Sequence, residues 1–271
     1  MNLFKRLFSR SDRQDQSERV YGATDVGRVR SGNEDYFLIR QKKNLLIASD
    51  GMGGHNAGEV ASQKASESVD TYFDSKLVAQ ILGDENTIMD EMKSSLLYAH
   101  QQVLEMAREK VEYRGMGCTI VIALIDQNTL HLCHVGDARA YVCDKKQMKL
   151  LTKDHSVVMS LVDKGDMTLE EARTSPMKNE LTQAIGGPGA MTPSYNRYEL
   201  KPDERLLMCS DGLWDMLSDQ EIFDIIRPAT SIKTVCENLI EQANQAGGKD
   251  NITVVMAEHP LSDPVEDGEQ A

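Results

Sequence analysis

The stretch Leu45-Leu46-Ile47-Ala48-Ser49-Asp50-Gly51 is an apolar run that ends in Ser-Asp-Gly. A second apolar run, Leu206-Leu207-Met208-Cys209-Ser210-Asp211-Gly212, ends in the same three residues. Short apolar runs bounded by turn residues are typical of buried strands. The glycine after each aspartate lets the backbone come close to a neighbouring group. We therefore expect a carboxylate at the C-terminal end of each of these two strands.

The segments next to the first run predict a hairpin followed by two helices. Residues 36–40 form another apolar run, and the polar turn 41–44 separates it from residues 45–49. Apolar residues then recur every three to five positions, which favours helices with one buried face. These positions are Ala57, Ala61, Ala65, Val69 and Phe73 in the first helix and Ile88, Met92, Leu96, Ala99, Val103, Met106 and Val111 in the second.

The rest of the chain predicts more strands and helices without a regular alternation. Strands are expected at 118–125, 130–135, 140–143, 148–151, 205–209 and 252–257, and helices at 156–173, 220–226 and 234–246. Because this order lacks the βαβ repeat of a parallel sheet, we expect an α+β fold with antiparallel sheets and helices on their outer faces.

The domain organisation follows from where the composition changes. No Pro- or Gly-rich linker interrupts residues 20–258, which we expect to form one domain. Residues 1–19 form a basic, amphipathic segment that we expect to be flexible. Residues 259–271 contain four acidic residues and no Lys or Arg, which predicts a disordered acidic tail.

The charge balance excludes one class of partner. The 271 residues include 30 Lys plus Arg and 43 Asp plus Glu, a formal charge of −13. A nucleic-acid-binding surface needs clustered basic residues, so we expect no nucleic-acid partner.

The five cysteines are odd in number and show no C-x-x-C spacing, which favours buried thiols. Without a signal peptide or a transmembrane segment, the chain is expected to be cytoplasmic, and we expect a monomer.

Five aspartates lie at strand ends or in turns between strands. They are Asp35, Asp50, Asp137, Asp211 and Asp250. Each one alone is compatible with a turn or a helix cap. Together, however, converging carboxylates repel one another and raise each other's pKa unless a cation neutralises them. Carboxylate and carbonyl oxygens suit Mg²⁺ or Mn²⁺, and too few His and Cys lie near these positions for an ordinary zinc site.

Arg30 is the cation in the same stretch that could complement a phosphate. It lies five residues before Asp35, and a guanidinium offers a bidentate fork to phosphate oxygens. An isolated Arg in a loop is more often part of a surface salt bridge, so this residue alone does not decide between the two roles.

With these residues in place, the chain resembles the metal-dependent PP2C-type (PPM) serine/threonine phosphatases, in their bacterial branch. The resemblance runs from about residue 20 to 258 and rests on eight motifs in order. They are 25–35 (Asp25 to Asp35), 49–54, 117–119, 135–139, 151–156, 181–186, 210–215 and 249–253. A single Ser-Asp-Gly would be weak evidence, whereas eight ordered motifs are specific.

The resemblance implies a four-layer α-β-β-α sandwich, with two antiparallel central sheets flanked by helices. It also implies two Mn²⁺ or Mg²⁺ ions held by Asp35, Asp50, the Gly51 carbonyl, Asp211 and Asp250, with Asp50 as the bridging ligand. Glu34 would act through a bound water and Arg30 would hold the phosphate. Asp137 matches a position that, with Asp211, supports a third and weaker metal in bacterial members.

The resemblance implies hydrolysis of phosphoserine or phosphothreonine in protein substrates, in opposition to a cognate Ser/Thr kinase. A hydroxide bridging the two ions would attack phosphorus while Arg30 and the metals stabilise the equatorial oxygens. The alternative from another class is a catalytically inactive phosphatase-like binding or regulatory module. A nucleotide-binding enzyme is disfavoured because no P-loop motif is present.

The sequence departs from the animal members of the family at Met52, where they carry a histidine proposed as general acid. Methionine cannot donate a proton. The nearest imidazole, His55, is expected to be structural, and our hypothesis for the proton source is a metal-bound water near Asp137. By the same resemblance, residues 156–178 form a flap beside the active site.

Overall fold

The structure is a computed structural model that describes residues 19–53, 57–229 and 231–258. The predictions for the N-terminal segment, for the acidic tail, and for Gly54 and His55 fall outside these residues. Within the described part of the chain, none of the helices combines the length and the apolar character that crossing a membrane requires.

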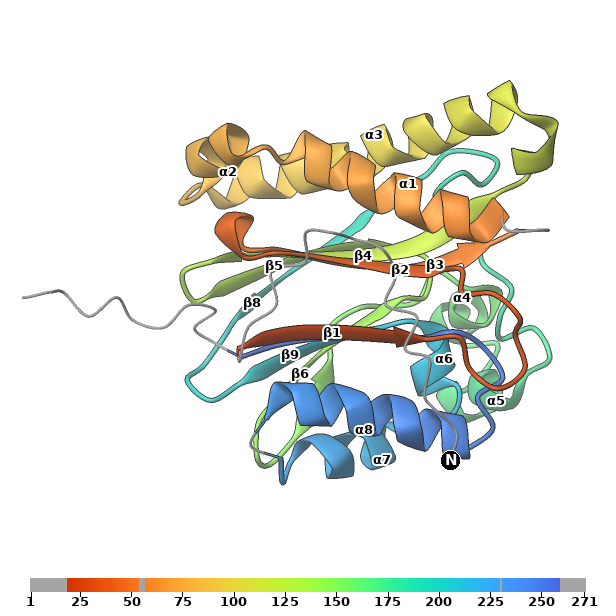
Figure 1. Ribbon diagram of the computed structural model, residues 1–271. Coiled ribbons are helices and arrows are strands. Elements are labelled where there is room, and N and C mark those ends of the chain that lie inside the picture. Colours follow the sequence, from red (N-terminus) through yellow and green to blue (C-terminus); the bar gives the residue numbers. More distant parts are fainter. Residues whose placement is uncertain (1–18, 54–56, 230, 259–271) are drawn as a thin grey trace, which may run out of the picture.

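Two five-stranded antiparallel sheets form the centre of the molecule (Figure 1). The first sheet has the order β2-β3-β4-β5-β8, and the second has the order β1-β10-β9-β6-β7. The first contains β2 (Asp35–Arg40), β3 (Leu45–Met52), β4 (Gly117–Asp126), β5 (Thr129–Val135) and β8 (Ser194–Glu199). The second contains β1 (Val20–Asp25), β10 (Ile252–Glu258), β9 (Arg205–Cys209), β6 (Arg139–Cys143) and β7 (Met148–Leu150).

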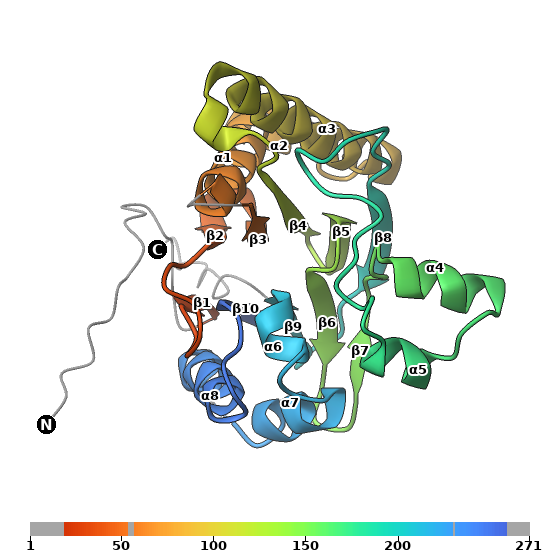
Figure 2. The same cartoon turned by 90° about the vertical axis from the view of Figure 1, so that its right-hand side faces the viewer.

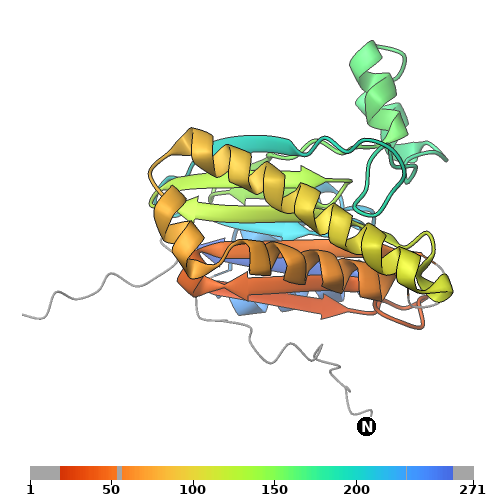
Figure 3. The ribbon, with the colours of Figure 1, turned by 90° about the horizontal axis from the view of Figure 1, so that it is seen from above.

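Helices cover the outer face of each sheet, which completes four layers (Figures 1 and 3). Above the first sheet lie α1 (Ala57–Tyr72), α2 (Ser75–Ile81) and α3 (Glu85–Glu109), and below the second lie α7 (Asp219–Ile226) and α8 (Ile232–Gln245). The short helix α6 (Asp211–Trp214) and the pair α4 (Val157–Lys164) and α5 (Leu169–Thr174) lie at one end of the sandwich (Figure 2). The expected α+β sandwich of antiparallel sheets is confirmed.

Each of the three interfaces between the four layers has its own apolar core. The first joins α1 and α3 to the first sheet through residues such as Ala61 and Leu96. The second lies between the sheets and includes Val121 and Met208. The third joins α7 and α8 to the second sheet. Burial of these side chains is the main force that holds the layers together.

Several elements differ from the prediction. Val111 lies beyond α3 in a 3-10 turn, and its side chain is 73% exposed, because the helix ends at Glu109. The single helix expected over 156–173 is two short helices, since Gly165 ends α4 in a left-handed conformation with φ of 77°. Strands β1 and β8 and helices α2 and α6 were not predicted. All five cysteines are buried and unpaired, as expected.

Candidate active site

The strand register brings the predicted aspartates to one end of both sheets. Asp35 opens β2 and lies directly opposite Asp50 near the end of β3. Asp211 follows β9 and begins α6, and Asp250 precedes β10. Asp137 lies in the turn between β5 and β6. Because β6 pairs with β9, the turn that carries Asp137 and the end of β9 that leads to Asp211 are neighbours.

Burial and mutual repulsion raise the pKa values of four of these aspartates. Burial is the main cause for each, and neighbouring carboxylates add to it. The pKa of Asp35 rises to about 7 and that of Asp211 to about 6. The pKa values of Asp50 and Asp137 also lie well above the ordinary range. The neighbouring carboxyl group of Asp211 raises the pKa of Asp50 further.

The donor set suits a hard divalent cation. Asp35 Oδ1 and Asp211 Oδ1 are buried and have no hydrogen-bond partner in the structure. A buried oxygen without a partner is costly, and a cation is a group that would satisfy it. Among the described residues, no group of three or more His, Cys, Asp or Glu side chains is already arranged to hold a metal ion. The case for a metal therefore rests on the orphaned oxygens and the crowded carboxylates.

The glycines that follow the two aspartates are required by close backbone contacts. A Cβ built on Gly51 would lie 2.2 Å from the Gly58 carbonyl oxygen and 2.4 Å from that of Glu34. A Cβ on Gly212 would lie 2.0 Å from the Asn251 carbonyl oxygen. Each Ser-Asp-Gly therefore packs its backbone against a segment that carries other acidic residues of the site.

Two further charged residues border the cluster. Arg30 Nη2 lies 2.6 Å from Asp250 Oδ2, and the two side chains are 50% and 32% exposed. The carboxylate of Glu34 accepts a hydrogen bond from the Gly58 backbone in the first turn of α1, a position that favours negative charge. Burial nevertheless raises the pKa of Glu34. The structure thus gives Arg30 the salt bridge that was one of its two expected roles and places that bridge at the site.

Neutral residues that were not given roles from the sequence orient the acidic ones. Ser210 Oγ donates to Asp35 Oδ2 at 2.7 Å and accepts from the Thr253 backbone at 2.9 Å, so it joins the two sheets. The side chain of Asn251 contacts three backbone groups of the loop that carries Arg30. Both residues lie next to a predicted ligand within a motif, which is the signal that could have drawn attention to them.

The Asp137 side of the site packs on Arg139, whose side chain is mostly buried. Arg139 makes a bidentate pair with Asp154 at 3.0 and 2.7 Å, and its guanidinium lies 3.8 Å from the ring centre of Trp214 on α6. His155 accepts a hydrogen bond from the Gly136 backbone at Nδ1 and stacks on His134, with 4.8 Å between ring centres. These contacts fix the turn that holds Asp137.

The helices α4 and α5 project from the site end of the sandwich, where a flap was expected (Figures 2 and 3). The base of this segment is held by backbone bonds between Val157 and Glu180 and between Thr182 and His155. Lys178 forms an ion pair with Asp215 at the end of α6. This segment is therefore tied to the helix that begins with Asp211.

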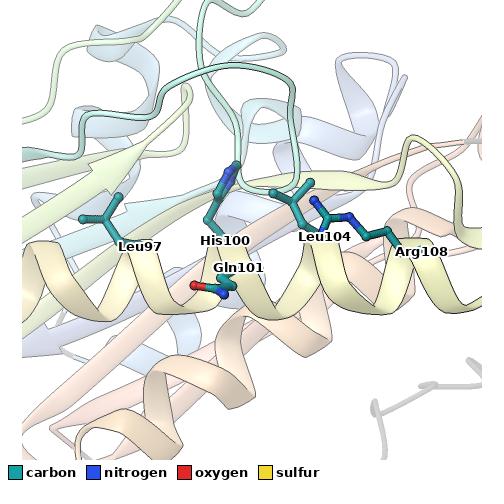
Figure 4. A pocket seen from close by; sticks show the side chains of 5 residues that line it. All are labelled: Leu97, His100, Gln101, Leu104 and Arg108. Carbon is teal, nitrogen blue, oxygen red and sulfur yellow. The ribbon is translucent and has the colours of Figure 1, made fainter.

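An open pocket of about 340 Å³ lies elsewhere, on the outer face of α3 (Figure 4). Its lining residues are Leu97, His100, Gln101, Leu104 and Arg108. His100 Nδ1 accepts a hydrogen bond from the Gly186 backbone at 3.0 Å. Because none of the clustered aspartates lines this pocket, we do not assign the chemistry to it.

Comparison with known proteins agrees with this class of fold and site. Residues 27–251 match the family model described as Protein phosphatase 2C. Protein phosphatase PhpP of Streptococcus pneumoniae is 36% identical over 242 residues, which cover 86% of this chain and 94% of PhpP. The serine/threonine phosphatase Stp1 of Staphylococcus aureus superposes with a TM-score of 0.82 at 33% identity, covering 90% of this chain and 96% of Stp1.

A third relative was solved with metal. The catalytic domain of the serine/threonine protein phosphatase PstP, in complex with two manganese ions, superposes with a TM-score of 0.76 at 32% identity and covers 89% of this chain and 97% of its own. The four-layer sandwich is thus the fold of these serine/threonine phosphatases. The chain belongs to the protein phosphatase 2C family.

Proposed function

We propose that this protein hydrolyses phosphoserine and phosphothreonine in protein substrates with the help of two divalent metal ions. The observation that carries the proposal is the convergence of buried aspartates from both sheets, two of them with orphaned oxygens, beside Arg30. The manganese-bound PstP neighbour supports the choice of metal. An opposing Ser/Thr kinase, a monomeric state and a cytoplasmic location stay predictions.

Asp35, Asp50, the Gly51 carbonyl, Asp211 and Asp250 would hold the two ions, and Asp50 would be the ligand that they share. Asp137 would complete a third site with Asp211, and Glu34 would act through a water. When bound, a pair of Mn²⁺ or Mg²⁺ ions supplies a water acidic enough to attack at neutral pH and offsets phosphate charge. Ser210 keeps Asp35 turned toward the site in this arrangement.

Arg30 would bind the phosphate. Its side chain is half exposed, so the guanidinium can direct its fork of N–H donors toward an incoming phosphate. The same residue forms the ion pair with Asp250, which keeps the positive charge at the edge of the acidic cluster. Arg30 would thereby hold the substrate phosphorus close to the ligands on both sheets.

The cysteines do not suit an alternative chemistry through a covalent phosphocysteine. All five thiols are buried, and burial raises the pKa values of Cys118 and Cys133 to about 12. A thiol of this kind is rarely ionised at neutral pH and cannot serve as a nucleophile. This favours direct attack by water.

The test is release of phosphate from a phosphothreonine peptide with Mn²⁺, with EDTA, and in the Asp211→Asn variant. We expect release with Mn²⁺ only, and a loss of at least about 100-fold in the variant. Absence of Mn²⁺-dependent release would favour the inactive binding module. Full activity in EDTA would contradict the metal-dependent mechanism.

A further inference from the structure

Asn251 lies between a proposed metal ligand and the last strand, and its side chain makes three hydrogen bonds to backbone groups. It is 3% exposed. Its Nδ2 donates to the carbonyl oxygens of Val26 at 3.0 Å and Gly32 at 2.9 Å, while its Oδ1 accepts from the Glu34 backbone N–H at 2.7 Å. Reversing the amide would oppose donors with donors, so this network fixes its orientation.

These three bonds close the base of the loop that carries Arg30. Val26 lies at the start of the loop and Gly32 near its end, and one NH₂ group holds both carbonyls. Backbone hydrogen bonds also join this loop to the segment before β10. They run from the Arg28 and Val29 N–H groups to the Gly248 carbonyl oxygen, at 2.7 and 3.3 Å. Val29 is largely exposed, and the side chain of Arg30 is half exposed.

The position of the Arg30 backbone, from which its side chain extends, therefore depends on Asn251. A guanidinium binds phosphate well only when its donors meet the oxygens in good geometry. Arg30 has a long, flexible side chain, so a loosened loop would leave the guanidinium present but poorly placed. Asn251 also lies next to Asp250, which pairs with Arg30.

We propose that Asn251 is a positioning residue that sets the reach of Arg30 toward the phosphate. It touches neither the phosphate nor a reacting atom. This inference rests on the proposed function for its kinetic consequence, but the closure of the loop can be measured without any activity.

The kinetic test is a double-mutant cycle on kcat/KM for a phosphothreonine peptide with saturating Mn²⁺. Loss of hydrogen bonds of this kind predicts a decrease of about tenfold in Asn251→Ala. Arg30→Ala should lose about 100-fold. If Asn251 acts through Arg30, the double variant loses no more than about twofold beyond Arg30→Ala. Multiplied effects, or an unchanged kcat/KM in Asn251→Ala, would overturn the proposal.

The second readout is amide hydrogen exchange over residues 26–34. We expect faster exchange there in Asn251→Ala. The matched control is Asn196→Ala on β8, which also removes an amide that donates to a backbone carbonyl, that of Leu151 at 2.8 Å, and should leave the loop unchanged. Unchanged exchange in Asn251→Ala would refute the clamp.

If Asn251→Ala does not fold, Asn251→Asp enters the same cycle and the same exchange experiment, since it keeps the shape and the acceptor for Glu34 but loses the amide donors. A wild-type protein without Mn²⁺-dependent hydrolysis would refute the proposed function, while the exchange comparison would still decide whether Asn251 closes the loop.

Discussion

Asp211 is the residue at which stability and activity are expected to oppose each other. Burial of its carboxyl group and the neighbouring carboxylates raise its pKa, so its charge costs folding free energy unless a cation is bound. We predict that Asp211→Asn, in EDTA, melts at the wild-type temperature or about 2–4 °C above it, corresponding to about 1 kcal/mol. Added Mn²⁺ should raise the melting temperature of the wild type and not that of the variant.

The control for this measurement is Asp224→Asn on α7, where the carboxylate is 51% exposed and lies 3.6 Å from Arg227. It should change neither the melting temperature in EDTA nor the increase with Mn²⁺. If Asp211→Asn retained the full increase with Mn²⁺, Asp211 would not be a ligand.

Two glycines near the site should respond differently to the same substitution. A Cβ on Gly212 would overlap the Asn251 carbonyl, whereas a Cβ on Gly32 would meet no atom within 4 Å. We predict that Gly212→Ala lowers the free energy of unfolding in urea by about 2 kcal/mol or more, as overpacking does. Gly32→Ala should stay within about 0.5 kcal/mol. Equal effects would contradict the close approach.

At this scale the sequence predicts charged residues better than neutral ones. Aspartates after apolar runs carry a recognisable chemistry, and the structure brings all five of them, with Arg30, to one end of the sandwich. Ser210 and Asn251 carry no charge, and their partners lie far away in sequence, 175 residues for Ser210 to Asp35. Their roles depend on how the two sheets meet, which local sequence does not encode.

Among the elements, the strongly apolar strands were predictable, whereas two of the four edge strands, β1 and β8, were not. Nine of the ten residues of β4 are buried, so it appears as a continuous apolar run. In contrast, β8 has no fully buried residue and β1 contains Gly22, over which the Phe37 ring packs. Both lie at sheet edges and are held largely by backbone pairing, β8 with β5 and β1 with β10. Backbone pairing leaves no periodic pattern of apolar side chains in the sequence.

The segment that connects β7 to α4 should make stability depend on pH through His155. Burial and the neighbouring His134 lower the pKa of His155 to about 4, below its ordinary value of 6.5. Between these pH values the folded state therefore binds fewer protons than the unfolded state. The contribution of His155 to the free energy of unfolding decreases as the pH falls through this window.

We predict that the wild type loses about 1 kcal/mol relative to His155→Asn between pH 7 and pH 4, a value reduced for the partial exposure of the ring. Asparagine can still accept from the Gly136 backbone but does not titrate. Urea denaturation at both pH values measures the difference. A difference between the two proteins that is independent of pH would exclude His155 as the titrating group.

For the whole molecule, the formal charge of −13 is partly a property of the site. Two divalent ions would change it to −13 + 4 = −9.

Every core and site residue discussed above lies between residues 19 and 258. We predict that a chain trimmed to these residues keeps its kcat/KM within about twofold and its melting temperature within about 3 °C. A larger loss would show that the flanking segments contribute to folding or catalysis.

The most direct test of the central claim is the number of Mn²⁺ ions bound per chain at equilibrium, measured by dialysis with the metal counted. A binuclear site predicts two tightly bound ions in the wild type, with any weaker third ion lost in Asp137→Asn. Asp50→Asn, which removes the carboxylate proposed as the shared ligand, should bind fewer than two. No bound Mn²⁺ in the wild type, or two tightly bound ions in Asp50→Asn, would contradict the assignment of this carboxylate cluster as a two-metal centre.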